Sequence, residues 1–137
     1  MANDVFVDTS GFYALLVKHD DRHAAASRVL RDAQRRKRRF VTSDYVLDET
    51  ATLLKARGHG HLLRAFFENV LASGVCRIEW TEPDRFHTVQ AFFHKHVDQP
   101  WSFTDCLSFC IMKELRLSEA LTKDGHFHEA GFVVLLK

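Results

Sequence analysis

Short apolar runs alternate with longer segments of helical periodicity along this chain, and that alternation limits the possible folds more than any other feature. The apolar runs are rich in β-branched and aromatic residues and end in polar turns, as buried strands do. They lie at 5–7, 40–42, 75–79, 120–122 and 133–136. Helices are predicted over about 12–33 with a break near 19–21, and over about 43–57, 61–73, 81–96 and 100–115. A capping box formed by Thr81 and Asp84 is predicted to open the 81–96 helix.

Strands separated by helices need crossover connections, which give a mostly parallel sheet covered by helices on both faces. The sequence therefore predicts an α/β fold. Its 137 residues, 46% of them hydrophobic, suffice for one domain spanning 1–137 but hardly for two.

Charge and cysteine content narrow the class of protein further. The net charge is only +1, so attraction to nucleic acid must come from a local patch. The three cysteines form no C-x-x-C pair, which favours reduced, buried thiols over a zinc or redox site. The first residues do not resemble a secretory signal, and no apolar stretch has the length of a membrane span. We expect a cytoplasmic protein without membrane contacts.

Four acidic residues are placed where a site can form. Asp8 and Asp124 follow strands, Asp105 falls at a helix beginning, and Glu49 shares or borders the inward face of the 43–57 helix. We expect them to converge on one cleft, where buried carboxylates would repel one another and take up protons without a neutralising cation. Oxygen ligands without cysteine favour Mg²⁺ or Mn²⁺, and such a site suits phosphodiester hydrolysis.

Each acid also has a purely structural explanation. Asp105 can close a capping box with Ser102, and Asp8 and Asp124 can be turn formers. Glu49 can pair with Arg57 or with a distant arginine. Only the joint placement of the four acids favours a site.

Four blocks of sequence strengthen this interpretation. They are Val5-Phe6-Val7-Asp8-Thr9-Ser10, Thr42-Ser43-Asp44-Tyr45-Val46-Leu47-Asp48-Glu49, Phe103-Thr104-Asp105-Cys106 and Thr122-Lys123-Asp124-Gly125-His126-Phe127. In this order they resemble the PIN-domain ribonucleases, especially the VapC-type toxins of toxin–antitoxin pairs. The resemblance implies a three-layer α/β/α sandwich, an RNA endonuclease dependent on Mg²⁺ or Mn²⁺, a cognate antitoxin that blocks the cleft, and a homodimer.

The resemblance also implies roles for individual residues. Asp8 and Asp105 would be the main direct metal ligands, Glu49 would complete or orient the metal shell, and Asp124 would act directly or through water. Thr9, Ser10 and Thr104 would line the site. Asp48 lies about 100° around the helix from Glu49, so Glu49 is the preferred acid. Position 126 is His where some relatives carry another carboxylate, which argues against a fully occupied second metal site and leaves His126 as a contact for the scissile phosphate.

Basic and histidine-rich stretches give weaker signals. The run Arg35 to Arg39, with Arg35, Arg36 and Arg38 as the chosen contacts, is either an RNA-backbone site or a solvated helix end. The pairs His59/His61, His94/His96 and His126/His128 resemble fragments of transition-metal sites, but helix-breaking loops and polar faces favour surface roles for most of them.

Two other classes of function compete with the nuclease. A phospho-accepting receiver-like module would also place acids at strand ends, but no second acid accompanies Asp8 in its loop. A non-catalytic RNA-binding protein of the same fold would not need the acids that are present here.

Overall fold

The computed structural model describes residues 3–72, 74 and 76–137. In chain order the elements are β1 (Val5–Val7), α1 (Thr9–Leu16), α2 (His23–Arg35), β2 (Phe40–Ser43), α3 (Asp44–Ala56), the 3₁₀ turn η1 (Gly60–Leu62), α4 (Leu63–Ala72), β3 (Cys76–Glu79), α5 (Pro83–Lys95), α6 (Phe103–Glu114), β4 (Glu119–Leu121), α7 (Gly125–Glu129) and β5 (Val133–Val134).

The strands form one parallel sheet in the order β3-β2-β1-β4-β5. Val5 and Phe6 of β1 pair with β2 on one side, and Phe6 and Val7 pair with β4 on the other. Along the chain, β2 and then β3 are added on one side of β1. The chain then returns and adds β4 on the other side of β1. The sheet therefore has a topological switch point between β1 and β4, and ligands of open α/β sheets bind beyond the carboxyl ends of such strands.

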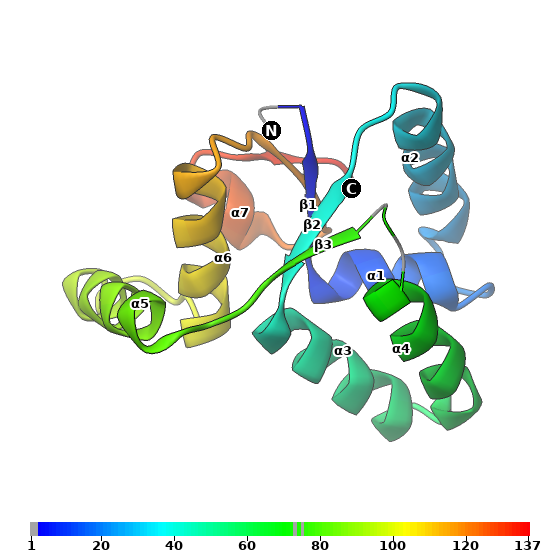
Figure 1. The fold of residues 1–137 in the computed structure, drawn as a ribbon, viewed down its shortest axis with the longest axis horizontal. Coiled ribbons are helices and arrows are strands. Elements are labelled where there is room, and N and C mark those ends of the chain that lie inside the picture. The colour runs from blue at the N-terminus through cyan, green and yellow to red at the C-terminus, as the bar shows by residue number, and fades with distance from the viewer. Residues whose placement is uncertain (1–2, 73, 75) are drawn as a thin grey trace.

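Helices cover both faces of the sheet, which confirms the predicted three-layer α/β/α sandwich. Helices α1 to α4 lie on one side, while α5, α6 and α7 lie on the other (Figure 1). Because β1 is covered on both faces, all three of its residues are buried, which explains its uninterrupted apolar sequence. Phe6 of β1 packs against Phe127 of α7 and so joins the sheet to one helical layer, and Phe12 packs against Phe66 within the other layer.

Gly11 allows α1 to begin immediately after β1. A Cβ at this position would lie 2.0 Å from the carbonyl oxygen of Leu121 in β4, so no other residue fits without backbone movement. This close approach holds the first turn of α1 against the end of β4.

Local details differ from the sequence predictions where distant partners intervene. The break near 19–21 is confirmed, and the Asp20 carboxylate accepts a hydrogen bond from the backbone N–H of Arg22. The capping box predicted at Thr81 and Asp84 is wrong: Glu82 occupies the N-cap without a side-chain bond, and Thr81 donates instead to Asp44.

Two elements have other bounds than predicted, and one helix was not predicted. Helix α1 begins earlier than predicted, β5 is shorter, and the five-residue α7 lies in what the sequence indicated only as a loop. Ser73 and Val75, at the predicted end of one helix and start of one strand, lie outside the described residues. Among the helices of the described ranges, none has the length and apolar character needed to cross a membrane.

Candidate active site

Asp8 lies at the switch point of the sheet, directly after β1. Its side chain is buried, and its Oδ2 accepts a hydrogen bond of 2.9 Å from the hydroxyl of Thr122, the residue that follows β4. Burial raises the pKa of the Asp8 carboxyl to about 7; the charges of Asp105 and Asp124 also raise it, while hydrogen bonds from Thr9 and Thr122 oppose the shift. The site thus holds a carboxylate that is costly to ionise without a cation.

Asp105 faces the same region from the first turn of α6. Its Oδ2 accepts from the backbone N–H of Ser102 at 3.1 Å, while the Ser102 hydroxyl accepts from the Asp105 backbone N–H at 3.0 Å. The capping box expected as a structural role is therefore present. It does not compete with a functional role, because the same contact fixes the direction of the carboxylate toward the site.

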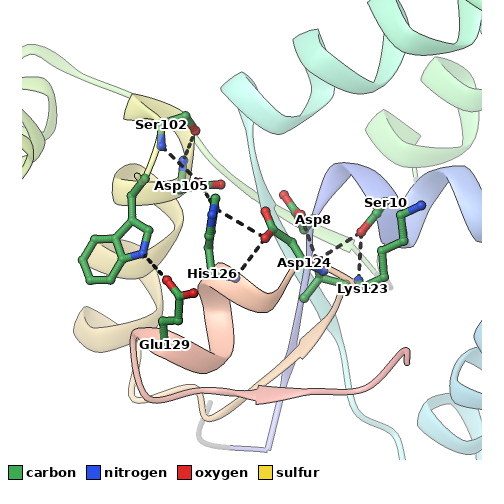
Figure 2. A network of polar contacts seen from close by, with 10 residues as sticks. Asp8, Ser10, Ser102, Asp105, Lys123, Asp124, His126 and Glu129 are labelled. Atoms are coloured by element: carbon green, nitrogen blue, oxygen red, sulfur yellow. Dashed lines mark hydrogen bonds and ion pairs between the residues drawn. The ribbon is translucent and has the colours of Figure 1, made fainter. Parts of the chain in front are cut away.

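Asp124 caps α7 and completes the group of aspartates. Its Oδ1 accepts from the backbone N–H of His126 at 2.9 Å, and its own N–H donates to the Thr122 hydroxyl at 3.0 Å. The Ser10 hydroxyl lies 3.1 Å from that of Thr122 and accepts from the backbone N–H of Lys123 (Figure 2). Two hydroxyls thus connect the first turn of α1 with the segment that follows β4. Thr122 was not predicted as a site residue, although it belongs to one of the four family blocks.

Of the two predicted alternatives for Glu49 of α3, its exposed side chain excludes a shared inward face and leaves a position at the border of that face. The inward side of this helix is formed by residues such as Val46, Leu47, Thr50 and Leu54. Instead of an arginine, the partner of Glu49 is Thr9, whose hydroxyl donates to Oε1 at 3.1 Å. This contact holds the Glu49 carboxylate at the border of the site.

The four predicted acids, from four different segments, line one cavity of about 550 Å³. Thr9 and Ser10 also line it, whereas Thr104 is not among its described lining residues. Cationic side chains that the sequence analysis did not select stand around the acids: Arg22, Arg57 and Lys123. The Arg57 guanidinium lies 5.1 Å from the ring centroid of Tyr13, another residue of the wall.

His126 lies between two of the acids. Its Nδ1 is 3.1 Å from Oδ2 of Asp105 and 3.4 Å from Oδ1 of Asp124 (Figure 2). Burial lowers the pKa of the His126 imidazole, but the hydrogen bond to Asp105 and the charges of Asp124, Asp105 and Glu129 outweigh burial, so the net shift is upward. Asp105, Asp124 and His126 form a group whose ligand atoms all lie within 4.8 Å of one another, and Asp8 is outside this trio.

The residues present fit a divalent cation of the kind that oxygen ligands favour. Carboxylates converge from separate elements, and one of them, Asp8, is buried and costly to ionise without a cation. Among the described residues no cysteine is near enough to join the group of Asp105, Asp124 and His126. The His126 imidazole lies beside these oxygen atoms and offers a nitrogen as a possible ligand atom.

The basic run Arg35 to Arg39 precedes β2, at the end of the parallel sheet opposite the acids. Arg38 is mostly buried, pairs with Glu119 and donates to the backbone carbonyl of Asn3, so its side chain has a structural role. Arg35 and Arg36 are exposed beside Asp32. Contact of Arg35 and Arg36 with RNA stays a prediction. The sequence did not reveal that these residues lie at the opposite end of the sheet from the cavity.

The other histidine pairs do not form a comparable group. His59 packs edge-on against Tyr13, and His96 packs against Phe92 and Trp101. Among the described residues, the only group of three or more possible metal ligands that includes a histidine is the one containing His126.

The chain is similar to known proteins over nearly its whole length. Residues 5–133 match the family model described as PIN domain. The chain is 34% identical over 129 residues to the 23S rRNA-specific endonuclease VapC20 in two strains of Mycobacterium tuberculosis, covering 94% of this chain and 95% of the relative.

A solved structure also matches the fold of this chain. The crystal structure of VapC20 from Mycobacterium tuberculosis, described as a sarcin-ricin loop cleaving toxin, superposes with a TM-score of 0.83 at 32% sequence identity. The match covers 98% of this chain and all of that chain. The receiver-like alternative is thereby excluded, and the chain belongs to the PIN domain family as a relative of the VapC-type toxins.

Proposed function

We propose that this protein is a divalent-metal-dependent endoribonuclease whose catalytic metal is held by Asp8, Glu49, Asp105 and Asp124. The observation that carries the proposal is the convergence of these acids on one cavity, with Asp8 buried and its pKa raised to about 7. A divalent cation bound there, Mg²⁺ or Mn²⁺, would lower the pKa of water and neutralise charge on the phosphate.

Each acid is held in place by a neighbour, which supports a preorganised site. Thr122 orients Asp8, and the backbone of Ser102 orients Asp105. Thr9 orients Glu49, and the backbone of His126 orients Asp124. These contacts use donors to fix oxygen ligands, so their loss is expected to weaken metal binding without removing a ligand.

The cationic rim suits the flanking phosphates of an RNA strand. Arg57 and Lys123 are exposed on the wall of a cavity whose interior is acidic, so a strand can contact cations on either side of the scissile bond. We propose these two residues as RNA-backbone contacts in addition to the earlier candidates Arg35 and Arg36.

This assignment can be tested by RNA binding in the non-cleaving Asp8→Asn background. Adding Arg57→Gln is expected to reduce the slope of log affinity against log salt by roughly 0.7–0.9, the effect of one lost phosphate contact. Adding Arg35→Gln tests the basic run in the same way. If Arg35→Gln reduces the slope and Arg57→Gln does not, the basic run contacts the RNA backbone and Arg57 does not.

The relatives suggest the first substrate and partner to examine. VapC20 is named as a 23S rRNA endonuclease that cleaves the sarcin-ricin loop. We propose a structured ribosomal RNA as the substrate of this chain, which would place its action in the cytoplasm. We also propose a cognate antitoxin that covers the acidic cavity. The homodimer stays a prediction.

The decisive experiment incubates the purified protein with ribosomes and with total RNA in Mg²⁺, Mn²⁺ or chelator, followed by sequencing of new 5′-phosphate ends. Asp8→Asn is expected to abolish the cuts. Asp48→Asn is the matched control, since Asp48 is exposed and is not among the lining residues of the acidic cavity. Cuts that persist in chelator or in Asp8→Asn would refute the proposed site.

A further inference from the structure

We propose that His126 is a direct ligand of the catalytic metal, binding through Nδ1 beside Asp105 and Asp124. The inference rests on the proposed function, since it concerns the same metal site. It adds a nitrogen to a ligand set otherwise composed of carboxylates, and it therefore bears on which metal the site selects.

The positions of the three ligand atoms carry the proposal. Nδ1 of His126 lies 3.1 Å from Oδ2 of Asp105 and 3.4 Å from Oδ1 of Asp124. In an octahedral shell with bonds of about 2.1 Å, neighbouring ligand atoms lie about 3.0 Å apart. The imidazole nitrogen therefore already stands at nearly the spacing that adjacent ligands of one ion require.

The backbone holds the ring where it is. The N–H of His126 donates to Asp124 at 2.9 Å in the first turn of α7, and this turn is anchored by the buried Phe127. The side chain of His128, on the same short helix, is exposed and is absent from the group of possible ligands. One histidine of the pair thus lies beside the acids, whereas the other does not join their group.

A nitrogen ligand changes the metal preference in a known direction. Imidazole suits transition metals, whereas sets made only of carboxylate and water suit Mg²⁺ as well as Mn²⁺. Ligation by His126 therefore predicts tighter binding of Mn²⁺ than of Mg²⁺, by about tenfold or more. Replacement of His126 by Asp is expected to bring the two affinities closer together.

Mn²⁺ itself is a suitable probe because it is paramagnetic. The full-length protein is loaded with Mn²⁺, and its electron spin echo envelope is recorded for the coupling of a directly bound ¹⁴N nucleus. The signal is expected in the native protein and in His128→Gln, and it is expected to vanish in His126→Gln and His126→Asp. In parallel, titration with Mn²⁺ and competition with Mg²⁺ give the affinity ratio of each variant.

The outcomes separate this inference from the proposed function. Mn²⁺ that binds, loses affinity in Asp105→Asn and shows no ¹⁴N coupling overturns the role of His126 while leaving the metal site intact. Mn²⁺ that does not bind at all overturns the proposed function. A ¹⁴N signal that survives in His126→Gln and is lost in His128→Gln would make His128 the nitrogen ligand and would overturn the proposal. Since the His126 side chain is partly exposed and its backbone bond remains in any variant, these substitutions are expected to fold.

Discussion

Replacement of Asp8 by Asn should stabilise the metal-free protein at and above neutral pH, although it removes a residue of the proposed active site. The side chain of Asp8 is buried, and its pKa is raised from 3.8 to about 7, chiefly by that burial. An amide at the same place keeps the polar shape but cannot ionise. The change therefore removes the cost of holding a buried negative charge near Asp105 and Asp124.

The magnitude follows from the linkage between proton binding and folding. A shift of about three units at about 1.36 kcal/mol per unit corresponds to roughly 4 kcal/mol. Since an amide is a weaker acceptor for the Thr122 hydroxyl, about 1–2 kcal/mol is subtracted, which leaves a gain of roughly 2–3 kcal/mol.

The upward direction of the Asp8 pKa shift determines the pH range over which the variant gains stability. The folded protein holds the Asp8 proton up to about pH 7, whereas the unfolded chain releases it near 3.8. The cost is therefore absent below pH 4, grows as the pH rises from about 4 to 7, and is constant above that range. The stability difference between Asp8→Asn and the native protein should follow this curve.

The assay is urea unfolding in chelator at a series of pH values from 4 to 8, followed by the fluorescence of the two tryptophans. Taking the difference between native and variant removes the titrations that both share. Asp48→Asn, at an exposed acid of α3, is the control and should run parallel to the native protein. Parallel curves for Asp8→Asn across pH 4 to 7 would falsify the claim that burial of this carboxylate opposes its ionisation.

Three other outcomes are expected. Mg²⁺ at a hundred times its dissociation constant should stabilise the native protein by about 2.7 kcal/mol and should stabilise Asp8→Asn much less. Its binding at pH 6 should release a proton from the native protein, which calorimetric titration can show. Gly11→Ala should cost about 1–3 kcal/mol in thermal unfolding because of the Leu121 carbonyl, whereas Gly60→Ala, in open space, should be tolerated. Arg38→Met should lower stability by about 1–3 kcal/mol through the lost contact with Glu119, yet leave RNA affinity unchanged; weaker RNA binding at native stability would contradict its structural role.

Most of the fold could be predicted because its signals are local. The buried run at 5–7 and the helical spacing after it need only neighbours in sequence to be recognised. Once the strands were seen to alternate with helices, the parallel sheet followed, and with it the position of Asp8 and Asp124 at one edge.

The errors arose where a residue had a partner far along the chain. Thr81 was predicted to cap its own helix, but Asp44, 37 residues earlier, accepts both of its hydrogen bonds. Arg38 was grouped with its basic neighbours, but Glu119, 81 residues later, pairs with it. Neither partner is visible in a local pattern, because the pairing depends on how the strands are ordered.

The candidate site divides in the same way. By itself the sequence determined that acids would gather beyond the strand ends, since chain direction and strand position follow from local periodicity. Only the tertiary structure decided that Glu49 would be exposed and bound by Thr9, that Thr122 would orient Asp8, and that His126 would stand between Asp105 and Asp124. The reason is physical: each of these relations joins segments that meet only after the sheet has formed, and α7, which presents His126, is too short to leave a periodic signal of its own.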